Sequence, residues 1–186
     1  MSDEIKKWKL QEREALIETR IFEVGATTCT HPDHEHPAKF WYVAPPDWAN
    51  IIALTDEDEI ILVRQYRHGT QQITLEIPGG MVDPGEDPEA AAARELREET
   101  GYLCERWEKL GEIAVNPAFM TNHCTTWLGT GAKLLAQTDF DEHEELGVEV
   151  YSVEQFFSMI DDGVITHGIV VSAAFYLKRY LERRGR

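Results

Sequence analysis

Residues 80–102, GMVDPGEDPEAAAARELREETGY, constrain the fold of this chain more than any other stretch, because they mark both ends of one helix. Asp87 suits the N-cap position and Pro88 the first helical position. The alanine- and glutamate-rich run that follows has high helix propensity, and Gly101 suits a left-handed C-terminal cap. The sequence therefore predicts a helix that begins after Asp87 and ends before Gly101.

Three glutamates converge on one patch of this helix. Glu95 and Glu99 stand at positions i and i+4, and Glu98 stands at i+3 from Glu95. Like charges at this spacing repel each other by roughly 0.2 to 0.5 kcal/mol per pair on an exposed helix. A divalent cation would offset this repulsion, and carboxylate oxygens favour Mg2+ or Mn2+. The alternative is an acidic helix face that is merely solvated.

The same stretch resembles the signature of the Nudix hydrolases, G-x5-E-x7-R-E-U-x-E-E-x-G-U, in which U is aliphatic. The positions in register are Gly80, Glu86, Arg94, Glu95, Leu96, Glu98, Glu99 and Gly101. Only Tyr102, an aromatic residue, stands where an aliphatic one is usual. The resemblance implies an α+β fold, an α/β/α sandwich with a mixed β-sheet. It also implies metal-dependent hydrolysis of a nucleoside diphosphate that is linked to a further group.

Within this resemblance, the helix and the loop before it supply most of the metal site. The carbonyl of Gly79 is the expected ligand beside the carboxylates of Glu95 and Glu99, with Mg2+ as the cofactor and Mn2+ as a substitute. Glu98 is expected to bridge the metals or to support their ligands. Arg94 is expected to orient these carboxylates by charge-assisted hydrogen bonds. A surface ion pair is the alternative for Arg94.

A second acidic segment, DEHEELGVEVYSVEQ at 141–155, corresponds to the loop that supplies the base in the ADP-ribose-cleaving branch of the family. By position, Glu142 is the expected base and Glu144 the expected additional metal ligand. Glu145 remains open as the base. A solvated acidic turn is the alternative for the whole segment.

Two stretches before the signature, VRQYR at 63–67 and LEIPGG at 75–80, are similar to the same branch. They make Arg67 and Glu76 candidates for contact with the diphosphate and the substrate. The remaining expected substrate contacts are Gly80, Met81 and Phe119. Pro117 matches a proline that accompanies ADP-ribose cleavage, although its neighbours in NPAFMTNH differ from the usual pattern and an ordinary turn is the alternative.

The catalytic domain is expected at 49–186, and residues 1–48 are expected to form an antiparallel β extension. The aromatic residues of this region are Phe40, Trp41, Tyr42 and Trp48. They suit either an interface or a nucleobase pocket, and the resembled branch uses such strands for both. We therefore expect a homodimer assembled through the extension. The cluster His31, His34 and His36 lies in a proline-bounded loop with Cys29 and lacks a complete tetrahedral ligand set, which leaves metal binding there open.

Short apolar or alternating runs predict strands along most of the remaining chain. The expected strands are Ile17–Val24, Phe40–Val43, Ala49–Leu54, Ile60–Gln65, Gln72–Ile77, Trp107–Val115, Thr125–Thr130 and Val148–Tyr151. Two further helices are expected, at Val153–Asp161 and at Ser172–Arg183.

Charge and composition exclude several classes of partner. The net charge of −16 repels nucleic-acid backbones and anionic lipid surfaces. No run approaches the roughly 20 apolar residues that span a bilayer, and MSDEIKKWKL lacks the apolar core of a signal peptide. Three scattered cysteines favour reduced thiols. We expect a cytoplasmic protein with no nucleic-acid or membrane partner.

The function expected from these features is hydrolysis of nucleoside diphosphate sugars, ADP-ribose and ADP-glucose among them, to a nucleoside monophosphate and a sugar phosphate. A hydrolase of modified nucleoside triphosphates would carry the same glutamates and is the first alternative. A non-catalytic sensor of ADP-ribose is the second. The sequence leaves open the base, the sugar, the attacked phosphorus and the number of metals.

Overall fold

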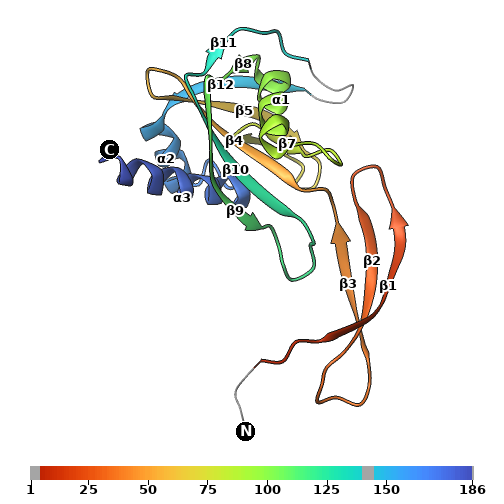
Figure 1. The fold of residues 1–186 in the computed structure, drawn as a ribbon. Helices are drawn as coiled ribbons and strands as arrows, with labels where there is room; N and C mark the ends of the chain where they lie inside the picture. The colour runs from red at the N-terminus through yellow and green to blue at the C-terminus, as the bar shows by residue number, and fades with distance from the viewer. Residues whose placement is uncertain (1–4, 140–144, 186) are drawn as a thin grey trace. The chain divides into compact units, whose positions relative to one another are not determined.

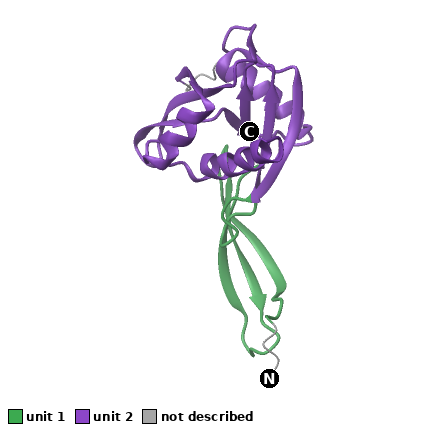
Figure 2. Ribbon diagram, turned by 90° about the vertical axis from the view of Figure 1, so that its left-hand side faces the viewer, with its two compact units in different colours: residues 1–46, 114–122 green, residues 47–113, 123–186 purple. Residues whose placement is uncertain are grey.

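The computed structural model describes residues 5–139 and 145–185, and the chain divides into two compact units (Figure 2). The first unit comprises Met1–Pro46 and Ala114–Asn122, and the second comprises Asp47–Ile113 and His123–Arg186. The sequence did not predict that Ala114–Asn122 belongs with the N-terminal region. Within the described residues, no helix is both long and apolar enough to cross a membrane.

The second unit is built on a mixed sheet with the strand order β12-β5-β4-β10-β9 (Figure 1). Strand β10 runs parallel to β4, whereas β12 and β7 pair antiparallel with β5 and β4. The strands of this sheet are β4 (Trp48–Leu54), β5 (Glu59–Arg67), β6 (Gln72–Glu76), β7 (Gly79–Met81), β9 (Arg106–Ala114), β10 (His123–Thr130) and β12 (Leu146–Ser152). A small pair, β8 (Tyr102–Leu103) and β11 (Lys133–Leu134), lies apart. The mixed sheet confirms the predicted fold class.

Helices cover both faces of this sheet because β4 and β5 bury alternate side chains on opposite sides. Ile51 and Ile61 pack with Leu96 of helix α1 (Pro88–Thr100) in one apolar cluster. On the other face, Ile52 and Leu62 pack in a second cluster. Its helical members come from α2 (Val153–Asp161) and α3 (Gly168–Arg183) and include Phe156, Ala173 and Leu177. These clusters form the layers of the α/β/α sandwich.

The ends of α1 are those that the sequence predicts. The Asp87 side chain accepts hydrogen bonds from the backbone amides of Glu89 and Ala90 at 3.0 and 3.1 Å. Gly101 closes the helix in the left-handed region with φ 74°, a conformation that glycine adopts without a Cβ penalty.

The start of α3 differs from the sequence prediction. The helix begins at Gly168 rather than at Ser172, and His167 is its N-cap residue without a side-chain capping hydrogen bond. Neither a capping serine or aspartate nor a strong helix former marks this start, so the sequence carries no local signal for it.

The first unit contains a three-stranded antiparallel sheet of β1 (Lys9–Glu18), β2 (Glu23–Thr30) and β3 (Ala38–Ala44). The predicted strand Ile17–Val24 is wrong, because a tight turn lies within it. The backbone amide of Thr19 donates to the carbonyl of Phe22 at 3.0 Å, and Ile17 and Val24 are cross-strand partners. The apolar residues Ile17, Ile21, Phe22 and Val24, which lie on both arms of the hairpin and in its turn, imitate one continuous strand.

Candidate active site

Helix α1 and the turn before it surround Arg94 with three carboxylates. The Arg94 guanidinium donates to both oxygens of Glu86 at 3.0 Å, to Glu95 at 2.8 Å and to Glu98 at 3.2 Å. It also donates to the carbonyl of Met81 at 3.1 Å, which ties the helix to β7. The hydrogen bond from Arg94 is the main reason that the pKa of Glu86 lies below its usual range. We call these four side chains the Arg94 cluster.

Strand β7 meets two carboxylates of the signature, those of Glu99 and Glu95, at two consecutive glycines. The buried Glu99 carboxylate accepts a hydrogen bond from the amide of Gly79 at 3.0 Å. A Cβ atom on Gly80 would lie 2.3 to 2.5 Å from the Glu95 carboxylate, so only glycine leaves room for that group. The i,i+4 glutamates therefore bring their carboxylates against consecutive glycines, as the helical spacing predicts.

The chemistry of these donors fits a divalent cation. Glu99 and Glu95, which reach Gly79 and Gly80 from α1, offer carboxylate oxygens, the ligands that Mg2+ and Mn2+ prefer. Within residues 5–139 and 145–185, no group of three or more His, Cys, Asp or Glu side chains forms a ready cation site. Glu95 and Glu99 would hold the metal, with the Gly79 carbonyl and Glu144 as the further expected ligands.

The expected base Glu142 and the expected ligand Glu144 lie outside the described residues. The last described residue before this segment, Asp139, lies beside α1, because its amide donates to the carbonyl of Glu98 at 2.9 Å. It returns at Glu145, directly before β12. The described chain therefore reaches the predicted catalytic segment from a residue that is hydrogen-bonded to α1.

A second polar cluster surrounds Glu76, whose side chain is only 2% exposed. Arg67 binds both carboxylate oxygens at 2.9 and 2.8 Å, the Thr74 hydroxyl donates at 2.6 Å, and Nδ1 of His167 lies 2.5 Å away. Burial alone would raise the pKa of Glu76. The hydrogen bonds from Arg67, His167 and Thr74 outweigh that effect and hold this pKa well below its usual range. We call these four side chains the Glu76 cluster.

A cavity of about 300 Å3 lies beside the Glu76 cluster. It brings together several residues that the sequence assigned to substrate or metal, namely Arg67, Glu76, Gly79, Gly80 and Met81. Trp48, Asn50 and His167 also line it. Sequence reasoning did not assign Asn50 or His167 to the site, and His167 lies 91 residues from its partner Glu76. No local motif marks such a pair.

Phe119, the remaining predicted substrate contact, lies in the first unit. Its carbonyl accepts a hydrogen bond from the amide of Val43 at 2.8 Å, and its own amide donates to the carbonyl of Asn116 at 3.1 Å. The segment around Pro117 therefore folds with β3. Contact between Phe119 and substrate stays a prediction.

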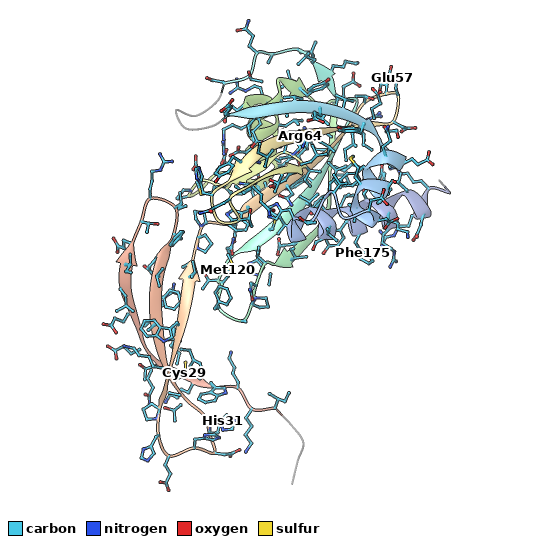
Figure 3. The ribbon with its side chains drawn as sticks, turned by 180° about the vertical axis from the view of Figure 1, so that it is seen from behind. Cys29, His31, Glu57, Arg64, Met120 and Phe175 are labelled. Carbon is cyan, nitrogen blue, oxygen red and sulfur yellow. The ribbon has the colours of Figure 1, made fainter. Side chains whose placement is uncertain are left out.

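The histidine cluster of the first unit is arranged around aromatic packing. Cys29 and His31 lie near one end of the three-stranded sheet (Figure 3). The rings of His31 and His34 are 4.6 Å apart, and Trp8 packs against both at 5.1 and 5.9 Å. Nδ1 of His31 accepts the amide proton of Asp33 at 3.2 Å, so this nitrogen is engaged within the loop.

Comparison with known proteins agrees with this geometry. The NUDIX domain matches residues 45–173, which include both clusters. The chain belongs to the Nudix family. It is 31% identical to the methanol dehydrogenase activator of Bacillus methanolicus and 28% identical to the ADP-ribose pyrophosphatase of Bacillus subtilis (strain 168). Each alignment covers 91% of this chain and 95% of the relative.

A solved structure of an ADP compounds hydrolase superimposes on this Nudix protein with a TM-score of 0.83 over the whole of both chains. At 24% identity this match establishes the fold. The resemblance inferred from the sequence, the Nudix family with its ADP-ribose branch, is confirmed.

Proposed function

We propose that this protein is a divalent-metal-dependent hydrolase of nucleoside diphosphate sugars, with Mg2+ as the metal and Mn2+ as a substitute. The observation that carries the proposal is that the carboxylates of α1 and the cavity meet at strand β7. The Glu95 and Glu99 carboxylates lie against Gly79 and Gly80, and the cavity that contains Arg67 includes the same glycines. Relatives named for ADP-ribose and ADP-sugar hydrolysis support the same chemistry.

Each residue then has a role in cleaving the pyrophosphate. Glu95, Glu99 and the Gly79 carbonyl would hold the metal, which when bound would supply positive charge to the phosphoryl oxygens. Arg94 fixes the orientation of the signature carboxylates by hydrogen bonds. Arg67, which Glu76 holds in place, binds the diphosphate.

The reaction itself needs a base and a water molecule. Glu142 takes a proton from the water, whose oxygen attacks one phosphorus in line as the bridging P–O bond breaks. The bridging oxygen leaves on the second phosphate, so the products are a nucleoside monophosphate and a sugar phosphate. Holding the substrate on both sides of the diphosphate positions the phosphorus for this attack.

The direct test is product identification. The protein would be incubated with ADP-ribose, ADP-glucose, GDP-mannose and UDP-glucose in Mg2+, and the products identified by mass. We expect one nucleoside monophosphate and one sugar phosphate from each substrate that is cleaved. Conversion of triphosphates with no conversion of any nucleotide sugar would contradict the proposal. Glu99→Gln serves as the inactive control.

We further propose a homodimer assembled through residues 1–48. Every one of the ten positions of β1 is exposed, and Trp41 on β3 is 62% exposed. An edge strand with apolar neighbours requires a covering surface. Light scattering at micromolar concentration should give twice the chain mass of 21.3 kDa, and a single-chain mass would contradict the dimer.

A further inference from the structure

Two adjoining hollows lie between the C-terminal half of α3 and the first residues of β9, away from the cavity at β7. The larger has a volume of about 550 Å3 and the smaller about 190 Å3, and Glu108 and Tyr180 line both. Strand β4 runs from Trp48, which lines the β7 cavity, to Leu54, which lines the larger hollow. At about 3.3 Å per residue along this strand, the two places are roughly 20 Å apart.

The smaller hollow is positively charged, although the chain has a net charge of −16. Its charged lining consists of Lys109, Arg179 and Arg183 against the single carboxylate of Glu108, which leaves an excess of two positive charges. Lys109 and Arg179 each pair with a glutamate of their own element, whereas Arg183 forms no ion pair with any described residue. Cations are common near a helix C-terminus, but Lys109 comes from β9 and faces the same hollow. The lining therefore suits a compact anion such as a phosphate group.

The larger hollow is lined by aromatic rings and carboxylates. Trp107 and Tyr180 line it together with Asp56 and Asp58 of the β4–β5 turn. The Arg184 guanidinium lies over the Tyr180 ring, 4.5 Å from its centroid, and the Arg184 side chain is 60% exposed. A planar base can stack on the outer face of such a guanidinium. The carboxylates can accept hydrogen bonds from the hydroxyl groups of a ribose.

We propose that these two hollows form a second nucleotide-binding site, which takes the base and ribose of a nucleoside monophosphate in the larger hollow and its phosphate in the smaller one. The charges set this orientation. In the larger hollow three carboxylates face two arginines, so a phosphate is repelled there and attracted to the smaller hollow. The larger volume lies within the range of ligand sites, whereas the smaller one suits a single charged group. The site does not depend on the proposed hydrolase activity, because its residues belong to neither the Arg94 cluster nor the Glu76 cluster.

Nuclear magnetic resonance can locate the ligand as well as measure its affinity. The 15N-labelled protein would be titrated with AMP, adenosine and inorganic phosphate in a chelator, so that no metal bridges phosphate to carboxylates. We expect AMP to shift the indole resonance of Trp107 and the amides of 179–184 until they saturate. Adenosine should shift the Trp107 resonance, and phosphate the amides of 179–183. AMP that shifts only resonances of the β7 cavity would overturn the proposal.

Two exposed arginines separate recognition of the phosphate from recognition of the base. Arg183→Gln removes a charge from the smaller hollow, so it should weaken AMP and phosphate by about tenfold and leave adenosine unchanged. Arg184→Gln removes the guanidinium over Tyr180, so it should weaken AMP and adenosine by about fivefold. Phosphate should bind Arg184→Gln as it binds wild type, because solution ions screen the lost charge.

Arg20→Gln is the matched control, because it removes one charge from an exposed arginine of the first unit. It should leave all three affinities unchanged, and thermal unfolding of each variant checks that the fold is retained. Three results would overturn the nucleotide assignment. They are unchanged affinities in both Arg183→Gln and Arg184→Gln, equal weakening of all three ligands in these variants, and phosphate binding without adenosine binding.

Discussion

The two Arg–Glu clusters of the catalytic unit have opposite compositions. In the Arg94 cluster one guanidinium faces three carboxylates, whereas in the Glu76 cluster one carboxylate faces a guanidinium, a hydroxyl and an imidazole. The first cluster keeps an excess of negative charge that a cation can offset. The second is satisfied by its own donors, so it serves as a fixed support.

Their exposure differs in the same direction. The side chains of Glu86, Glu95 and Glu98 are 19%, 16% and 28% exposed, against 2% for Glu76. A partly exposed acidic cluster can exchange a proton, a water molecule or a metal, whereas a buried and saturated carboxylate cannot. We therefore propose that the chemistry takes place on the Arg94 side of β7 and that the Glu76 side fixes the shape of the cavity.

The largest effect on activity and metal affinity is expected from neutralising Glu95 and Glu99. Glu95→Gln and Glu99→Gln should each lower activity and metal affinity by more than about 100-fold, because even support residues around a metal are worth roughly 10- to 100-fold. Calorimetric titration with Mn2+ measures the affinity directly. Glu89→Gln, in the first turn of α1, is the matched control. Unchanged Mn2+ binding in both Glu95→Gln and Glu99→Gln would show that these glutamates have only a structural role.

The expected base, Glu142, belongs to neither cluster and lies in the downstream acidic segment. Glu142→Gln should lower kcat by roughly 10^2 to 10^4, the usual worth of a positioned base, with little change in substrate binding. Steady-state kinetics of Glu142→Gln, Glu144→Gln and Glu145→Gln would separate the three candidates. A near-normal rate for the first and an inactive second or third variant would move the base to that residue.

The contrast between the clusters also explains what the sequence could predict. The Arg94 cluster lies within 86–98, where caps and helical spacing are local, so the sequence predicts Asp87 as the N-cap and brings Glu95 and Glu98 together on one patch of the helix. The Glu76 cluster joins two strands to the start of α3. His167 has no capping residue type and contacts a partner 91 residues away, so neither the helix start nor the contact was predicted.

The error in the first unit has a similar cause. Periodicity reports which residues alternate, and it does not report where a chain reverses. Ile17 and Val24 are partners across the β1–β2 hairpin, yet the apolar residues of both arms and of the turn between them follow one another closely enough to predict one strand. The placement of Ala114–Asn122 with β3 depends on backbone hydrogen bonds to Val43, which no sequence pattern encodes.

Replacing Glu76, the centre of the Glu76 cluster, should change the free energy of unfolding more than the rate of the chemical step. Glu76→Gln should lower the free energy of unfolding by about 2 to 3 kcal/mol, less than a fully buried pair because Arg67 is 43% exposed. The pKa of Glu76 is lowered by folding, so its contribution is complete above its usual value of 4.5 and is lost as the pH falls below it.

Denaturant titration of wild type and Glu76→Gln between acid and neutral pH measures this dependence. The difference between the two proteins should narrow as the pH falls from about 4.5, because the unfolded wild-type chain takes up a proton before the folded one does. A difference that stays constant through this range would show that Glu76 is not held ionised by its partners.

The smallest expected effect is a loss of stability in the Arg94 cluster that depends on metal. Arg94→Ala should cost about 1 to 2 kcal/mol of stability, because it leaves three carboxylates without their shared cation. Mg2+ should restore part of that loss, and thermal unfolding with and without Mg2+ measures it. Arg97→Ala, which removes one exposed ion pair to Glu98, is the matched control and should respond much less. A loss in Arg94→Ala that Mg2+ leaves unchanged would separate this cluster from metal binding.

We propose that the site binds groups on both sides of a pyrophosphate. The most direct measurement is kcat/KM for ADP-ribose, ADP-glucose, GDP-mannose and UDP-glucose against dGTP and dATP at one Mg2+ concentration. We expect a nucleoside diphosphate sugar to have the highest value, because binding energy from base and sugar is available only to such a substrate. A triphosphate preferred by tenfold or more would contradict the substrate assignment.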